Sequence, residues 1–260
     1  MRLDGKNGLV FGVANDRSIA WAITEAVVNA GARVGLSYQG ERLERRVLPL
    51  ADRINADLCM QCDVTDDEQL DAYFAKATQV FGKIDFLVHS VAYAPRADLM
   101  GRFVETSRDG YRVAQDVSAY SLIELCRRAR PLMSEGGSVV ALTYYGGEKV
   151  IPNYNVMGPG KAALEASVRY LASDLGPENI RVNAISAGPI KTLAAAGIPG
   201  FREMLKETAA RTPLRRNVTY AEIANTALFL TSEMGSGVTG ETIHVDGGYH
   251  VMGAPPGPHG

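Results

Sequence analysis

Tyr154 and Lys161 are the two residues in this chain best suited to chemistry, and six residues separate them in the segment PNYNVMGPGKAAL. On a helix, an i,i+7 step returns to nearly the same face, so a helix through both residues would direct phenol and ammonium into one cleft. A neighbouring positive charge is expected to lower the pKa of a phenol from its usual value of about 10. Such a phenol can donate a proton or hydrogen bond to an oxygen that gains charge. The alternative is a surface lysine and a half-buried tyrosine.

The composition restricts the classes of protein to consider. The chain has 260 residues, enough for one large α/β domain, with a net charge of -2 and a pI of about 6.1. This balance gives no electrostatic reason to expect nucleic acid or an anionic membrane as a partner. The apolar runs have the length of strands, so no transmembrane helix is predicted, and the N-terminal sequence lacks a signal-peptide pattern.

Three cysteines include one CxxC pair, Cys59 and Cys62, in an apolar stretch. No second CxxC or histidine cluster accompanies the pair. We therefore expect buried thiols, no bound metal and a reducing, cytoplasmic location.

Strand-like and helix-like segments alternate along the chain. The expected strands cover residues 8–12, 33–37, 58–61, 84–89, 138–143, 180–185 and 241–245. The expected helices cover about 19–30, 41–54, 67–81, 111–133, 155–175 and 219–231. Apolar strands separated by amphipathic helices predict a seven-stranded parallel, doubly wound sheet with helices on both faces. Residues 1–252 are expected to form this single α/β domain, with an insertion at 193–211 and a Gly/Pro-rich tail at 253–260.

The turn after the first strand, GVANDRSIAWAI (12–23), is a candidate phosphate site. A glycine, a tight turn and a helix N-terminus present backbone N–H groups and a positive dipole to a phosphate. The segment lacks the G-x-G-x-x-G pattern, and an ordinary strand-turn-helix fits it equally well. Ser18 is also a natural N-cap residue.

Residues after the next strands extend this candidate site. Gln39 follows the second strand, where NAD-binding folds usually carry an acidic residue. Asp63 follows the third strand and is suited either to accept a hydrogen bond from an adenine amino group or to begin a turn. The small residues of HSVAYAP (89–95) follow the fourth strand, and they either admit a ligand or form only a loop.

Five segments together resemble one family. GVANDRSIAWAI, QCDV, HSVAYAP, PNYNVMGPGKAALEASVRYLA and RVNAISAGPIKTLAAAGIPGF occur in the order and spacing of the bacterial enoyl-[acyl-carrier-protein] reductases. These enzymes are a divergent branch of the short-chain dehydrogenase/reductase superfamily, whose other members show a Tyr-x-x-x-Lys pair. The resemblance covers residues 3–252 and implies a Rossmann-like fold.

The resemblance implies that NADH lies across the carboxyl ends of the strands. The residues implied to contact it are Gly12, Ser18 and Ile19 at the pyrophosphate, Gln39 at the adenosine ribose, Asp63 and Val64 at the adenine, Ser90, Val91 and Ala92 on the nicotinamide side, Lys161 at the nicotinamide ribose, Ile190 at the carboxamide and Thr192 near the pyrophosphate. The residues implied to contact substrate are Ala94, Tyr144, Tyr154, Ala194 and Ile198. Residues 193–205 resemble the flexible substrate-binding flap of the family.

The implied reaction is hydride transfer to the β-carbon of a trans-2-enoyl thioester. Tyr154, assisted by Lys161, is implied to stabilise the enolate oxygen, while Tyr144 is a catalytic candidate with a less defined role. The implied partners are acyl carrier protein and three further copies of the chain in a homotetramer. Helices 111–133 and 155–175, apolar on more than one face, agree with such an assembly. Two alternatives stay open: a carbonyl reductase of the same superfamily, and a non-catalytic dinucleotide-binding protein.

Charged residues lead to two further expectations. The end of the second strand, Tyr38 to Glu41, offers no cation to a 2′-phosphate, which favours NADH over NADPH, although Arg42, Arg45 and Arg46 follow closely.

An acidic carrier protein is expected to dock on a basic surface. The basic residues on and after the expected flap are Arg202, Lys206, Arg211, Arg215 and Arg216.

Pro159 lies between Tyr154 and Lys161. A proline inside a helix removes a hydrogen bond, but in the first turn the missing N–H costs little. We therefore expect the helix to start late enough for Pro159 to lie near its first turn.

Overall fold

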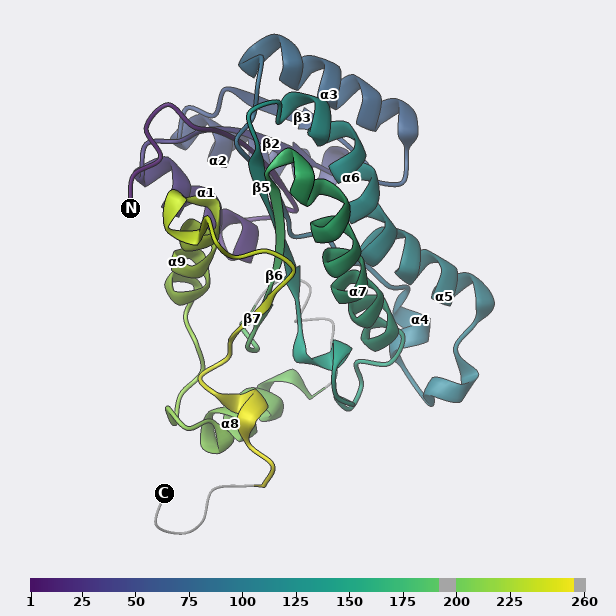
Figure 1. Cartoon of the computed structure of the whole chain (residues 1–260). Coiled ribbons are helices and arrows are strands. Elements are labelled where there is room, and N and C mark those ends of the chain that lie inside the picture. The colour runs from purple at the N-terminus through teal and green to yellow at the C-terminus, as the bar shows by residue number, and fades with distance from the viewer. Residues whose placement is uncertain (192–199, 255–260) are drawn as a thin grey trace.

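The computed structural model describes residues 1–191 and 200–254, whose strands form one parallel sheet in the order β3-β2-β1-β4-β5-β6-β7 (Figure 1). The strands are β1 (Asn7–Phe11), β2 (Arg33–Tyr38), β3 (Leu58–Gln61), β4 (Phe86–His89), β5 (Gly137–Thr143), β6 (Ile180–Ala187) and β7 (Thr242–Val245). The seven predicted strands are confirmed to within two residues at either end. The predicted single Rossmann-like sheet is confirmed as well.

Helices cover both faces of this sheet, as predicted (Figure 1). They are α1 (Ile19–Asn29), α2 (Gly40–Arg53), α3 (Asp67–Phe81), α4 (Arg96–Leu99), α5 (Arg108–Gln115), α6 (Ser121–Ala129), α7 (Met157–Leu175), α8 (Phe201–Arg211) and α9 (Tyr220–Thr231). Residues of α1, α2 and α9 pack on one face, and residues of α3, α6 and α7 pack on the other. Helix α8, inside the expected insertion, lies below the sheet in Figure 1.

The helix expected at 111–133 is interrupted. A π-helical turn (Asp116–Tyr120) separates α5 from α6, and a 3₁₀ turn (Arg130–Leu132) ends the segment. In the π turn, the Ser118 hydroxyl lies 3.2 Å from the carbonyl oxygen of Tyr93 and accepts from its N–H at 3.1 Å. These bonds tie the turn to the loop after β4. Hydrophobic periodicity alone carries no sign of such a local bulge.

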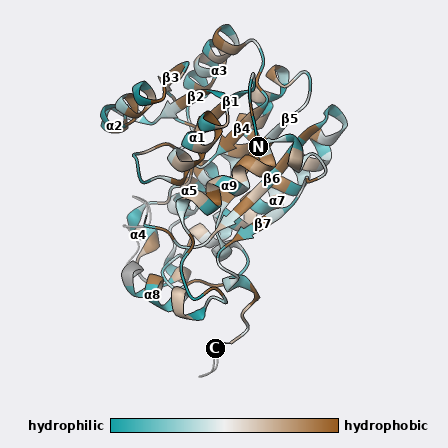
Figure 2. Cartoon of the chain, turned by 90° about the vertical axis from the view of Figure 1, so that its left-hand side faces the viewer, coloured by the Kyte–Doolittle hydropathy of each residue, from teal (hydrophilic) through white to brown (hydrophobic). Residues whose placement is uncertain are grey.

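Strand residues alternate between two hydrophobic layers. In β1, Leu9 and Phe11 belong to the layer under α3, α6 and α7, while Val10 belongs to the layer under α1, α2 and α9. This is the period of two that a strand buried on both faces requires. Figure 2 shows the hydrophobic residues gathered on the strands and on the helix faces that cover them.

The strand order reverses between β1 and β4, which are neighbours in the sheet. In open α/β sheets, ligands bind outside the carboxyl ends of the strands at such a switch point. Gly12 and Ser90 lie there, directly after β1 and β4. Gly12 has a φ of +105°, and a Cβ on it would lie 2.1 Å from the carbonyl oxygen of Ser90. Only glycine therefore fits this position.

Candidate active site

Tyr154 precedes helix α7, which begins at Met157. Asn153 and Asn155, on either side of Tyr154, have φ values of 64° and 41°, so the chain turns sharply there instead of continuing as a helix. The prediction that Tyr154 and Lys161 share a helix face is therefore wrong. The expectation for Pro159 is confirmed, because it is the third residue of α7 and lies in the first turn.

Tyr154 packs against Tyr144 in spite of this turn. Their ring centroids lie 5.0 Å apart with an interplanar angle of 73°, an edge-to-face contact. A Cβ on Gly146 would lie 2.4 Å from Cδ1 of Tyr154, so the ring fits closely against the 3₁₀ helix η4 (Tyr145–Gly147). Ala94 belongs to the small hydrophobic cluster against which Tyr154 packs. Three of the predicted substrate residues thus lie in one part of the site.

Burial raises the pKa of Tyr154, and the neighbouring Tyr144 and Glu165 raise it further. Burial also raises the pKa of Tyr144, to about 12. The expectation that Lys161 would lower the pKa of Tyr154 is therefore wrong, because loss of hydration is the largest cause and it raises the pKa. The phenol of Tyr154 keeps its proton at neutral pH and is a hydrogen-bond donor.

Lys161 is 5% exposed, and its Nζ donates to the carbonyl oxygen of Leu142 at 2.7 Å. Burial lowers its pKa to about 8, and the charge of Glu165 acts in the opposite direction. Lys161 is thus a buried cation at neutral pH and loses its proton just above it. A buried ammonium that changes charge near the working pH is typical of a functional site.

The sequence did not predict a group of polar residues near Lys161. Thr143 Oγ1 donates to Glu165 Oε1 at 2.6 Å, and His244 Nε2 pairs with Glu148 Oε1 at 2.6 Å. The position of Glu165 four residues after Lys161 was an available signal, since residues at i and i+4 are neighbours on a helix. His244 comes from β7, nearly a hundred residues later, and no local pattern points to it.

Gln39 and Asp63 meet at the other end of the switch point. Gln39 Nε2 donates to Asp63 Oδ2 at 2.7 Å, which joins the ends of β2 and β3. Asp63 Oδ1 also accepts from the N–H and hydroxyl of Thr65 at 2.9 and 2.8 Å, so the turn role expected of Asp63 is confirmed. Val64, next to Asp63, is half-buried. Burial is the largest single effect on Asp63 and raises its pKa, but the hydrogen bonds from Gln39 and Thr65 together outweigh it, so the pKa is lowered.

Ser18 caps helix α1. Its Oγ accepts from the N–H of Trp21 at 3.2 Å and donates to the carbonyl oxygen of Asn15 at 2.9 Å. The N-cap role is therefore confirmed, and the hydroxyl is used within the protein. Ile19 begins the helix, where helical geometry gives the first N–H groups no intrahelical partner, and Ser18 takes the one of Trp21. Backbone groups, together with Gly12, are thus the ones available to a phosphate.

Small residues after β4 complete the edge of the site. Ser90 and Val91 are half-buried, Ala92 is exposed, and Ile190 after β6 is buried. These residues follow β4 and β6 and so lie at the carboxyl ends of the strands. Thr192, Ala194 and Ile198, which were also predicted to bind ligand, lie outside the described residues.

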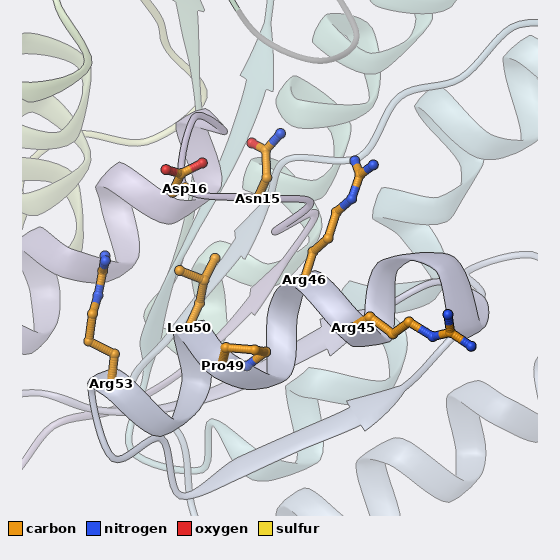
Figure 3. Close-up of a pocket in the computed structure, with 7 residues that line it drawn as sticks. All are labelled: Asn15, Asp16, Arg45, Arg46, Pro49, Leu50 and Arg53. Carbon is orange, nitrogen blue, oxygen red and sulfur yellow. The ribbon is translucent and has the colours of Figure 1, made fainter.

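Two surface hollows lie along α2, and neither is lined by Tyr154 or Lys161. One is lined by Asn15, Asp16, Arg45, Arg46, Pro49, Leu50 and Arg53, and the other by Glu41, Arg42, Arg45 and Arg46. Figure 3 shows Arg46 extending from α2 toward the loop of Asn15, whereas Arg45 points away from it. Arg53 pairs with Glu25 at 2.8 Å. Arginine side chains of α2 therefore line both hollows, and one of these hollows also contains Asn15 and Asp16.

Within residues 1–191 and 200–254, no group of three or more histidine, cysteine or acidic side chains is placed to hold a metal ion. In the same part of the chain, no helix is both long and apolar enough to cross a membrane.

Comparisons with known proteins agree over nearly the whole chain. A family model described as enoyl-(acyl carrier protein) reductase matches residues 12–250. The enoyl-[acyl-carrier-protein] reductase [NADH] of Bacillus cereus is 54% identical, with 96% of this chain and 99% of that protein covered. A Rhizobium meliloti protein of the same description is 53% identical, with 96% and 92% covered.

Solved structures give the same result. The Bacillus cereus enzyme in complex with NADP⁺ and an indole naphthyridinone is 54% identical, with a TM-score of 0.95 and with 98% of this chain and all of that chain covered. The Anaplasma phagocytophilum enzyme in complex with NAD is 48% identical, with a TM-score of 0.95 and 99% and 100% covered. The chain therefore belongs to the enoyl-[acyl-carrier-protein] reductase family.

Proposed function

We propose that this protein reduces the C=C bond of a trans-2-enoyl thioester on acyl carrier protein, with NADH as the reductant. Membership of the family supports the reaction, and the observation that carries it is the placement of Tyr154. Its phenol is kept protonated by burial, its ring contacts Tyr144, and it packs against the small cluster that contains Ala94. A neutral donor in a desolvated site is what a thioester oxygen needs as it becomes an enolate.

The residues at the switch point fit a dinucleotide. Gly12 lets the backbone after β1 pass directly against Ser90, where a Cβ would clash, and α1 begins a few residues later with an N-terminus suited to a pyrophosphate. Gln39 and Asp63 offer uncharged and anionic acceptors for ribose hydroxyls and an adenine amino group. Lys161 is suited to the nicotinamide ribose. When bound, NADH supplies the hydride that reaches the β-carbon.

Side chains of the protein stabilise the negative charge that develops on the thioester oxygen. The phenol of Tyr154 donates to the thioester carbonyl oxygen and strengthens that bond as negative charge develops. The ammonium of Lys161 adds positive potential from behind. Tyr144, in edge contact with Tyr154, excludes water and fixes the orientation of its ring. The α-carbon then takes up a proton to complete the saturated thioester.

We also propose NADH over NADPH as the preferred cofactor. The described residues at the end of β2 include no cation, and Glu41 would repel a 2′-phosphate. Arg42 and Arg46 are the residues that could instead favour NADPH by binding a 2′-phosphate. They line the hollow that also contains Glu41, and they form no ion pair with another described residue. Steady-state kinetics with both cofactors tests the point, and a higher kcat/KM with NADPH would contradict it.

A homotetramer is the proposed assembly. In the interrupted helix, Leu122 is buried against the sheet, while Tyr120 and Ile123 on the outer side are 48% and 37% exposed. Tyr111 of α5 is also exposed. Apolar residues on an outer helix face favour a second layer of protein there. Light scattering at micromolar concentration tests this, and a monomeric mass would contradict it.

A cytoplasmic location is proposed from the thiols. Cys59, Cys62 and Cys126 are free, and burial raises the pKa of each. Reduced, unreactive thiols of this kind agree with a reducing compartment.

The assay that tests the reaction is NADH loss with crotonyl thioester set against simple ketones. The proposed function predicts turnover of the enoyl thioester alone. Reduction of ketones at a comparable rate would favour a carbonyl reductase, and NADH binding without any turnover would favour a non-catalytic protein.

A further inference from the structure

Glu165 is a carboxylate buried behind the reactive pair. It lies on α7 four residues after Lys161 and is 6% exposed. Thr143 Oγ1, at the end of β5, donates to its Oε1 at 2.6 Å. A Cβ on Gly147 would lie 2.8 Å from the same oxygen, so the carboxylate is packed under η4. Acidic side chains are seldom this buried unless they have a charged partner or a function.

The charged groups around Glu165 come from several elements. Lys161 lies one turn earlier on α7, Glu148 follows η4, His244 comes from β7, and the phenol of Tyr154 lies before α7. Glu148 and His244 pair with each other. His244 stacks on His250 at 3.9 Å, and His250 pairs with Asp246.

Lys161 has few other partners for its charge. Its Nζ donates to a neutral carbonyl oxygen, and the titratable group that faces it from β4 is His89. Burial lowers the pKa of His89 to about 3, so that imidazole is neutral and offers no counter-charge. The carboxylate whose charge acts on Lys161 is Glu165. Burial raises the pKa of Glu165, while the hydrogen bond from Thr143 and the charge of Lys161 lower it and so favour the carboxylate. A buried ammonium without an opposite charge is costly, and charge interactions in a desolvated site are strong.

We infer that Glu165 is a positioning residue for the reaction, whose buried negative charge, held by Thr143, keeps Lys161 protonated. The two side chains need not touch, because a charge one helical turn away acts through the protein interior. The inference rests on the proposed function for the role of Lys161, but not for its protonation.

Glu165→Gln tests this, since it removes the charge and keeps both the shape and an oxygen that can accept from Thr143. Loss of a nearby opposite charge lowers the pKa of a lysine by about one unit or more. With the pKa of Lys161 at about 8, half of it is protonated at that pH in the wild type. In the variant about a tenth would be, so kcat/KM falls about fivefold at pH 8 and less than twofold at pH 6.

Asp174→Asn is the matched control, because it removes an exposed carboxylate from the same helix. Its pH profile is expected to coincide with that of the wild type. A defect of Glu165→Gln that is equally large from pH 6 to pH 9 would mean that Glu165 has only a structural role, and it would overturn the inference.

NADH affinity measured by fluorescence without substrate gives a second readout. For Glu165→Gln, the dissociation constant is expected to rise at lower pH than in the wild type. Thr143→Val removes the hydrogen bond that holds the charge. It is expected to shift the pH profiles of kcat/KM and of NADH affinity in the same direction by a smaller amount, and it replaces Glu165→Gln as the test if that variant does not fold. Unchanged profiles in the variant that folds would contradict the inference. A wild type that binds NADH but reduces no enoyl thioester would overturn the proposed function, and the binding profiles would still test Glu165.

Discussion

Gly12→Ala is expected to damage both the fold and cofactor binding. At a φ of +105°, a residue with a Cβ carries a strain of about 1–3 kcal/mol. The new Cβ would also lie 2.1 Å from the carbonyl oxygen of Ser90, so Ser90 must move. The N–H of Ser90 donates to the carbonyl oxygen of Phe11 at 2.9 Å, and this bond, which typically contributes about 1 kcal/mol, would be weakened. Together these terms give a loss of roughly 2–4 kcal/mol, or about 4–16 °C in melting temperature.

Gly82→Ala is the control for backbone strain alone. Gly82 has a φ of +67°, and nothing lies within 4 Å of the Cβ that it would gain. Its cost is expected to be about 1–2 kcal/mol. Thermal unfolding compares the two variants, and fluorescence titration is expected to show NADH affinity about tenfold weaker or worse for Gly12→Ala only. If both variants melt at the same temperature and bind NADH equally, the close approach of Gly12 to Ser90 does not form the cofactor site.

Three further outcomes are expected. Tyr154→Phe keeps the ring against Tyr144 but removes the donor, so kcat should fall on the order of 10²–10³ with little change in melting temperature; a near-normal kcat would exclude Tyr154 as the oxyanion donor. Because burial lowers the pKa of Lys161 to about 8 and the protonated form is the active one, kcat/KM of the wild type should decline as the pH rises through that value, and a flat profile to pH 10 would show that this charge is not needed. Lys206→Glu, on the exposed side of α8, should slow a carrier-linked substrate more than a coenzyme A substrate, especially at low salt, and equal effects would remove α8 from the docking surface. Arg216 is already paired with Glu222, so Arg216→Ala should have a smaller effect on carrier-linked turnover.

The sheet could be predicted from the sequence because its strands are buried on both faces and read as continuous apolar runs. The residues that follow the strands, such as Gly12, Gln39 and Asp63, were placed correctly for the same reason: parallel strands end at one edge of the sheet. Boundaries set by irregular backbone were harder. The left-handed turns at Asn153 and Asn155 put Tyr154 outside α7, and the π turn at Asp116 to Tyr120 broke a periodic helix.

The electrostatics of the site could not be predicted, because burial is a property of the folded chain. Proximity of Lys161 suggested a lowered pKa for Tyr154, whereas removal of water from the phenol raises it. Glu165 was visible at the right spacing from Lys161, but only the contact with Thr143 and the packing under η4 reveal a buried charge. Long-range partners such as His244 have no local signal at all.

In the proposed reaction, hydride reaches the β-carbon of an enoyl thioester whose oxygen is held by Tyr154. Turnover of crotonyl thioester with NADH deuterated at both C4 positions, followed by mass spectrometry and NMR of the product, shows which carbon receives the hydride. We expect butyryl thioester with deuterium at the β-carbon, formed by the wild type and at least about a hundredfold more slowly by Tyr154→Phe. Deuterium delivered instead to the carbonyl carbon, or equal rates for the two proteins, would contradict it.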